Sequence, residues 1–485
     1  MTEVSRMSHP FTSYSTPIDK LPVEILAEIF KFCAASYPKL PGRRSTDLCL
    51  VRKHWNAVAN STPQLWTKIN LSFPCEPDHL SAAQRRVVAS KQEKIDVSIK
   101  LYTALWCNDE RSLDSTSVGK ASEFILVGRV LRGTEKRWKS LKVVADAWLP
   151  LFKLTKALET AEFQALESIS MEQSVPDPEA FDQPVTLLGR LACLPKFCDL
   201  SLSAVYLDWD GISASFQGLR RLKIQNRTGG VGLSFEVFAA KVSSLTQLEC
   251  LDVSGFYPEQ HAGPGLPAGG GQIVPTVRLP ALKEFTFGWR DVDSGSSFLG
   301  MFQIGSSLEN LTLLDATSSL GNREGFLRSD HDWSQSSEHI FSTLHELGIA
   351  APGDSNDLPP GPFISLRGVK RLMIGWTKTS PQALNPFLSM LTKLEDITLE
   401  DVDKNVLEAV AARATGNCRL RLDFKWMWKR NVPRFAEGII LNLEKAGNKV
   451  FARGAGEQAI GSGPLFFNSD FTGLVSIPSR PGTPM

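Results

Sequence analysis

The first strongly patterned stretch of the chain lies near its N-terminus, between Leu21 and Trp66. Proline is tolerated in the opening turn of a helix, so Pro22 fits the start of one. Apolar residues then recur at the spacing of one helical face, at Ile25, Leu26, Ile29, Phe30 and Cys33. After a polar spacer over residues 34–46, the series continues with Leu48, Val51, Trp55 and Val58, and then with Pro63, Leu65 and Trp66. The pattern predicts three short helices around a small core.

A second pattern fills most of the remaining chain. A six-residue motif, Leu-x-x-Leu-x-Leu with aliphatic or aromatic substitutes, recurs at a mean spacing of about 28 residues. The ten copies begin at Trp138, Leu166, Phe197, Leu219, Leu248, Leu282, Leu308, Leu344, Val369 and Leu394. Such regular recurrence predicts an internally repeated architecture.

The local pattern around each motif indicates a helix followed by a strand. The last three positions of a motif alternate inward and outward, which is the period of a strand. Segments 234–245, 296–308 and 381–394, which precede three of the motifs, have helical spacing. A doubly wound α/β domain also alternates helices and strands, but it does not require the same motif at each strand. The sequence therefore predicts an α/β fold built from irregular helix-turn-strand units.

The order of landmarks in the N-terminal stretch resembles the F-box: Leu-Pro, Glu-Ile-Leu-x-x-Ile-Phe, Val-x-x-x-Trp and Pro-x-Leu-Trp. The resemblance implies a helical module that docks onto the linker subunit of a cullin-based ubiquitin ligase. The contact would come from Leu21, Pro22, Ile25, Leu26 and Ile29, with Trp55 in the core or the interface. The long spacer and Arg52 depart from the family pattern. An unrelated three-helix bundle would share the apolar spacing but not the ordered landmarks.

The recurring motifs resemble leucine-rich repeats, so the whole chain resembles a leucine-rich-repeat F-box protein of the divergent type found in mushroom-forming fungi. This resemblance implies an irregular solenoid after the F-box. The expected organisation is a disordered segment 1–16, an F-box 17–70, a linker and cap 71–137, a solenoid 138–452 and a disordered tail 453–485. The alternating residues 95–101 are expected to form an edge or capping strand.

In such a solenoid, target contacts would come from side chains that point outward from the strands. These are Arg221, Lys223, Gln225, Cys250, Asp252, Glu284, Thr286, Asn310, Thr312, Arg371, Met373, Asp396, Thr398 and Glu400. Their charges run from basic toward acidic along the chain. Trp289 and Trp376 each follow a glycine at a strand end and would be binding hot spots if exposed, or would pack over the loop ends. Insertions at 261–271 and 315–340 form a second candidate surface.

The composition of the chain argues against a nucleic-acid-binding, membrane-bound or secreted protein. With 485 residues and 42% hydrophobic content the chain can bury a sizeable core, and its net charge of +1 gives no global attraction to nucleic acid or to an anionic membrane. We find no signal peptide and no apolar run of membrane-spanning length. Eight scattered cysteines are typical of thiols in a reducing compartment, which indicates the cytoplasm or nucleus.

No catalytic constellation or cofactor motif is present in the sequence, so the protein is predicted not to be an enzyme. His331, Asp332 and His339 raise the question of a metal site, but they lie in a polar insertion typical of solvated loops. Cationic and aromatic side chains are interleaved over residues 419–434, and such side chains could contact the phosphates and stack on the bases of a nucleic acid. The simpler interpretation is that this segment is the last strand, with a charged outer edge. The predicted function is a substrate-recruiting adaptor of a cullin-based ubiquitin ligase with an unidentified target, and the alternative is a repeat scaffold not linked to degradation.

Overall fold

The computed structural model describes most of the chain, and the segments that it describes fall into two compact units, Met1–Ser170 and Met171–Met485. The described residues are 17–36, 43–73, 77–102, 131, 133–174, 194, 196–205, 216, 218–225, 235–254, 276–289, 292–315, 334–351, 362–375, 377, 379–413, 418–424, 434–445 and 448–454. The two predicted disordered segments lie almost wholly outside these residues. The division between the units falls inside the predicted repeat region.

The first unit opens with a helical module. Its elements are η1 (Pro17–Lys20), α1 (Val23–Ala35), α2 (Arg43–Val51), α3 (Lys53–Ser61) and η2 (Pro63–Trp66). The prediction of a single helix over Leu48 to Val58 was wrong, because Arg52 has extended backbone angles of φ −156° and ψ 157° and separates α2 from α3. Helix α2 begins at Arg43, inside the stretch that the sequence indicated as a polar spacer.

The other described elements of the first unit are parallel strands with intervening helices. The elements are β1 (Lys68–Phe73), α4 (Pro77–Ala89), β2 (Ile95–Leu101), η3 (Glu135–Arg137), β3 (Trp138–Ala145) and α6 (Trp148–Leu158). Strand β2 pairs with β1 on one side and β3 on the other, so of the two predicted alternatives for residues 95–101 the edge strand was wrong, and the capping strand stays a prediction. Side chains along β2 alternate between buried and more exposed positions. Pairing on both sides fixes the register of the strand, and the register determines which side chains face the core. Strand β4 (Ser168–Gln173) crosses the division between the units.

The second unit contains a long parallel sheet whose strands follow chain order. The strands are β5 (Asp199–Ser203), β6 (Arg221–Gln225), β7 (Cys250–Ser254), β9 (Glu284–Trp289), β11 (Asn310–Asp315), β13 (Arg371–Gly375), β14 (Asp396–Glu400), β15 (Arg419–Phe424) and β16 (Lys449–Gly454). The motif leucines share one register: Leu222 lies opposite Leu251, which lies opposite Phe285. All three are buried. The α/β class with a parallel sheet is confirmed, and the leucine-rich-repeat solenoid stays a prediction.

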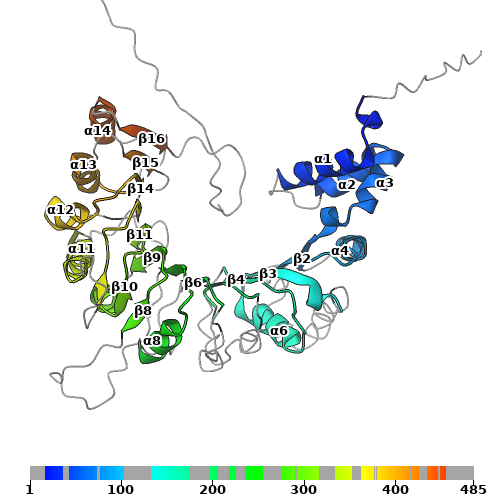
Figure 1. Ribbon diagram of the computed structural model, residues 1–485, viewed down its shortest axis with the longest axis horizontal. Helices are drawn as coiled ribbons and strands as arrows, with labels where there is room; N and C mark the ends of the chain where they lie inside the picture. Colours follow the sequence, from blue (N-terminus) through cyan, green and yellow to red (C-terminus); the bar gives the residue numbers. More distant parts are fainter. Residues whose placement is uncertain are drawn as a thin grey trace, which may run out of the picture. The chain divides into compact units, whose positions relative to one another are not determined.

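Helices connect many of these strands. They are α8 (Phe235–Ser243), α9 (Val292–Leu299), α11 (Ser334–Ile349), α12 (Pro381–Ser389), α13 (Lys404–Arg413) and α14 (Arg434–Lys445). Helices α9, α11, α12, α13 and α14 pack against one another in sequence, and the last four form a row beside strands β11, β14, β15 and β16 (Figure 1). A second parallel sheet joins three short strands, β8 (Val277–Leu279), β10 (Phe302–Ile304) and β12 (Phe363–Ile364). Among the described helices, none combines the length and apolar character needed to cross a bilayer.

Three expectations for the repeats were wrong in detail. The motif at Leu344 lies in helix α11, because a Leu-x-x-Leu spacing also fits one helical face. Leu344 and Leu347 are buried there, whereas the third position, Ile349, is 64% exposed. The helix expected over 296–308 ends at Leu299 and gives way to β10. Strand β15 is not the last strand, since β16 follows it.

Candidate functional site

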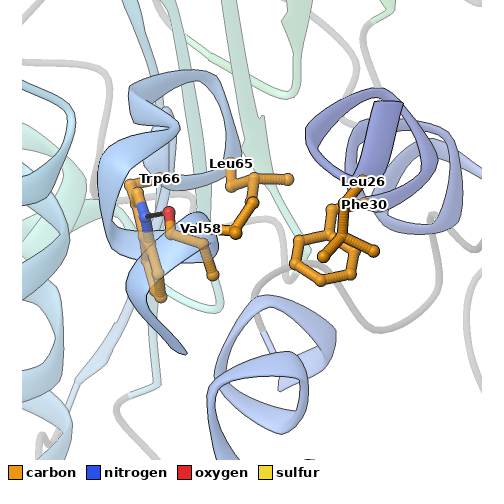
Figure 2. Packing of buried hydrophobic residues seen from close by; sticks show 6 residues of the cluster. Leu26, Phe30, Val58, Leu65 and Trp66 are labelled. Carbon is orange, nitrogen blue, oxygen red and sulfur yellow. Dashed lines mark hydrogen bonds between the residues drawn. The ribbon is translucent and has the colours of Figure 1, made fainter. Parts of the chain in front are cut away.

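The helical module has a compact apolar core. Leu26 and Phe30 of α1 lie against side chains of α3 and η2, which are Val58, Leu65 and Trp66 (Figure 2). The indole Nε1 of Trp66 donates a hydrogen bond to the carbonyl oxygen of Ala59 at 2.9 Å. This bond satisfies the polar atom of a ring that is only 8% exposed, and it links η2 to α3.

Beside this core, α1 carries a solvent-exposed apolar face. Ile25 is 50% exposed and Phe32 is 73% exposed, and Ile29 is partly exposed between them. The three residues are spaced four and three positions apart, so they lie on one side of the helix. Leu21, which is partly exposed, and Pro22, which is exposed, precede them at the helix start. We call these five residues the α1 apolar face.

Helix α2 adds two further exposed apolar side chains. Leu50 is 78% exposed and Val51 is 53% exposed, at the end of α2. Apolar side chains that remain in water on a small module are typical of an interaction surface. Sequence reasoning missed Phe32, Leu50 and Val51 as surface residues. Phe32 lies three residues after Ile29 and seven after Ile25, and this spacing could have predicted that it shares their helical face.

One of the predicted contact residues has a different position, and Trp55 lies in one of its two predicted positions. Leu26 is fully buried, so its side chain belongs to the core of the module and is not part of the surface. It faces inward with Phe30 because the two are one helical turn apart. Trp55 is partly buried and lies against Phe30, with ring centroids 5.0 Å apart. Trp55 therefore helps to fix α3 against α1 at the margin of the core.

The outward side chains of the long sheet form ion pairs between neighbouring strands. Arg221 on β6 contacts Asp199 on β5 at 2.9 Å, and Lys223 contacts Asp252 on β7 at 3.0 Å. On β15, Nε of Arg419 lies 2.7 Å from Asp396 Oδ1 on β14. The prediction of a surface that runs from basic to acidic was therefore incomplete, because several of its charges neutralise each other across the strands.

Glu284 is held by two neutral donors on adjacent strands. The side-chain amide of Asn310 on β11 donates to its carboxylate at 2.9 Å, and the thiol of Cys250 on β7 also donates to it. Burial, followed by the nearby charge of Glu284, raises the pKa of Cys250 to about 12. This thiol is thus a hydrogen-bond donor and a poor nucleophile at neutral pH. All cysteines among the described residues are free.

Two predicted surface residues are buried instead. Trp289 is 0% exposed, and its ring lies 5.9 Å from Phe287 and 6.4 Å from Phe341. The strand alternation that buries Phe285 and Phe287 also directs Trp289 inward, so the expectation of an exposed hot spot at Trp289 was wrong. Glu400, at 6% exposed, is also buried at its strand end. Trp376 lies outside the described residues.

The remaining predicted outward residues lie on the exposed side of the sheet. Thr286, Thr312, Met373 and Thr398 are partly exposed in one row, and Arg371 is exposed beside them. The described residues contain no group of three or more His, Cys, Asp or Glu side chains arranged to hold a metal ion. His339 lies exposed on α11, whereas His331 and Asp332 lie outside the described residues.

Comparison with known proteins supports the interpretation of the helical module. No curated protein matches the sequence. The F-box-like family model matches residues 18–72, which span α1, α2, α3, η2 and most of β1. The match includes the whole α1 apolar face. The resemblance to the F-box is thereby confirmed, and the chain contains an F-box-like domain at residues 18–72.

Proposed function

We propose that this protein is an adaptor that recruits a target to a cullin-based ubiquitin ligase. F-box domains bind a linker subunit of such ligases, and an F-box-like domain suggests a role in substrate recognition for ubiquitin transfer. In this proposal the α1 apolar face, with Leu50 and Val51, contacts the linker. The second unit holds the target protein on the outward side of its sheet.

The observation that carries the proposal is the exposure of the α1 apolar face within the matched domain. Ile25 and Phe32 are at least half exposed, although burying an apolar side chain of this size stabilises a protein by about 1.5–3 kcal/mol. The apolar core of the module is complete without them. Their burial would therefore be gained on binding a partner.

The parallel strands support a repeat architecture in the second unit. Of the eight motifs that begin within the second unit, seven fall at strands, and the motif at Leu344 does not. We infer that the unit is an irregular leucine-rich-repeat solenoid whose strands present an extended surface. The adaptor would act by proximity, because it brings a lysine of the target near a charged ubiquitin carrier and makes no bond itself. F-box proteins are generally non-catalytic adaptors, and we propose the same here, in the cytoplasm or nucleus.

The test is affinity purification of the full chain from cells of its own source, followed by mass spectrometry. Recovery of the linker together with a cullin is the expected result. Targets should then accumulate when the proteasome is inhibited. Recovery of neither ligase subunit would contradict the proposal. A scaffold that is not linked to degradation would recover the linker without the cullin.

A further inference from the structure

The outward side of β13, β14 and β15 carries two arginines that have no ion-pair partner among the described residues. Six side chains lie in its first two rows, and a third row continues with Gly375, Glu400 and Asp423. The first row is Arg371, Asp396 and Arg419, and the second is Met373, Thr398 and Arg421, as the strand register shows. We call these six residues the β13–β15 patch. Three of them are cations and one is an anion.

The single anion of the patch is already neutralised. Asp396 accepts contacts from Arg419 through Nε at 2.7 Å and through Nη2 at 3.1 Å. Only the Nη2 contact is a hydrogen bond, to Oδ2, whereas Oδ1 is buried and has no hydrogen-bond partner among the described residues, so the Nε contact is one of charge alone. Arg371, although it lies directly opposite Asp396 in the register, makes no ion pair with it.

Two cations of the patch consequently remain available. The guanidinium groups of Arg371 and Arg421 are exposed, and neither has an ion pair or a side-chain hydrogen bond to the described residues. On β6, by contrast, Arg221 and Lys223 both have acidic partners. The six residues of the patch sum to a charge of about +2, with neutral Met373 and Thr398 between the two available cations. The next row adds two negative charges, from buried Glu400 and partly exposed Asp423.

We propose that the β13–β15 patch binds an acidic segment of the target protein through carboxylates that pair with Arg371 and Arg421. This inference rests on the proposed function and specifies the chemistry of its target. Each guanidinium offers a planar pair of donors that matches one carboxylate. Met373 supplies an adaptable apolar contact between them.

The separation of the two arginines favours two carboxylates over one shared anion. Their Cα atoms are two strands and two residues apart, which corresponds to about 12 Å. In an extended segment, residues i and i+4 point to the same side and lie about 13 Å apart. Two acidic residues with this spacing would therefore each reach one arginine.

The experiment is selection of binders to the full chain from a random peptide library, followed by affinity measurement with the selected peptides. The selected sequences should be enriched in Asp and Glu at two positions. The double substitution Arg371→Gln with Arg421→Gln should weaken binding by at least tenfold. Arg278→Gln, which removes an exposed arginine of β8 in the other sheet, should leave binding unchanged.

Several results would overturn the proposal. Selection of no peptide, absence of acidic enrichment, or equal binding by the double variant and the original chain would each exclude an acidic partner at this patch. Peptides in which phosphoserine replaces the selected Asp and Glu residues test whether the patch binds phosphate in place of carboxylate. Tenfold tighter binding of these peptides would assign the patch to a phosphorylated segment. Binding of the linker subunit by the double variant separates a failure of this inference from a failure of the proposed function. If the linker is still recovered but no acidic peptide binds at the patch, the proposed function stands and this inference falls.

Discussion

Arg221 and Asp199 lie opposite each other on neighbouring parallel strands, and Nη2 of the arginine is 2.9 Å from Oδ2 of the aspartate. The arginine side chain is 61% exposed, so the pair lies at the surface and contributes modestly to stability. The pair matters for function, because a charge that is paired within the sheet is less available to a binding partner. The cations without such a pair are therefore the better candidates for contact with a target.

Charge reversal on β6 should therefore affect stability as well as binding. In the double variant Arg221→Glu with Lys223→Glu, each new carboxylate faces an existing one, Asp199 or Asp252. Like charges directly opposite on adjacent strands are destabilising, so we expect a loss of about 1 kcal/mol in the free energy of unfolding. Urea denaturation provides the measurement.

A matched control for this prediction is the double variant Arg367→Glu with Lys393→Glu. Both residues are exposed, and neither belongs to an ion pair among the described residues. The control should change the free energy of unfolding by less than about 0.5 kcal/mol. Equal destabilisation by the two double variants would show that the cross-strand pairs contribute nothing specific.

The strand register predicts opposite outcomes for neighbouring residues on β11. Leu311 is 1% exposed, and truncation to alanine should cost about 2–5 kcal/mol through lost burial and a cavity. Thr312 points outward, so Thr312→Ser should be nearly silent. Thermal and chemical denaturation compare the two, and similar losses would mean that the register is wrong. Asp252→Asn would be a poor control, because Asp252 pairs with Lys223.

Two glycines should respond very differently to alanine. A Cβ atom on Gly368 would lie 2.5 Å from the carbonyl oxygen of Ser306 and 2.8 Å from that of Leu308, and backbone atoms cannot easily move away. Gly368→Ala should therefore destabilise by about 1–3 kcal/mol. At Gly305 a Cβ would meet nothing within 4 Å, so Gly305→Ala should be tolerated. Urea midpoints that coincide for both variants would contradict the close approach at Gly368.

The raised pKa of Cys250 predicts a loss of stability in alkali. The folded state holds the thiol proton up to a pKa of about 12, whereas the ordinary pKa is 9.0, so the folded protein binds more protons between these values. Stability should consequently fall as pH rises through this window. In Cys250→Ser the hydroxyl can still donate to Glu284 but does not titrate. The variant should show a shallower decline in urea denaturation above pH 9, and identical declines would contradict the assignment.

The sequence predicted the parts of the fold that depend on periodicity. Alternation placed Leu222, Leu251 and Phe285 on the buried side of consecutive strands, because a strand has only two faces. The same rule could have buried Trp289, which continues the series of Phe285 and Phe287. Leu344 was misplaced because its spacing suits a helix as well as a strand, and only tertiary packing decides between them.

The candidate site was less predictable from the sequence. The landmarks identified the helical module, but periodicity could not separate Leu26, which is buried, from Ile25, which is half exposed. Adjacent positions on a helix differ by about 100°, so the boundary between core and surface depends on where α3 and η2 pack. The ion pairs between strands also could not be predicted from the sequence, because Asp199 and Arg221 become neighbours only through the register of the sheet.

The central claim is that the α1 apolar face binds the linker subunit of a ubiquitin ligase. The most direct measurement is the affinity of the full chain for the purified linker, compared with that of Ile25→Asp. The original chain should bind. The variant should lose at least a hundredfold in affinity because it places a charge in an apolar contact, and its melting temperature should be retained because Ile25 is half exposed. Val88→Asp, a similar change at a side chain of α4 that is 76% exposed, should bind normally. Absence of binding by the original chain, or equal affinity for Ile25→Asp and the original chain, would contradict the account.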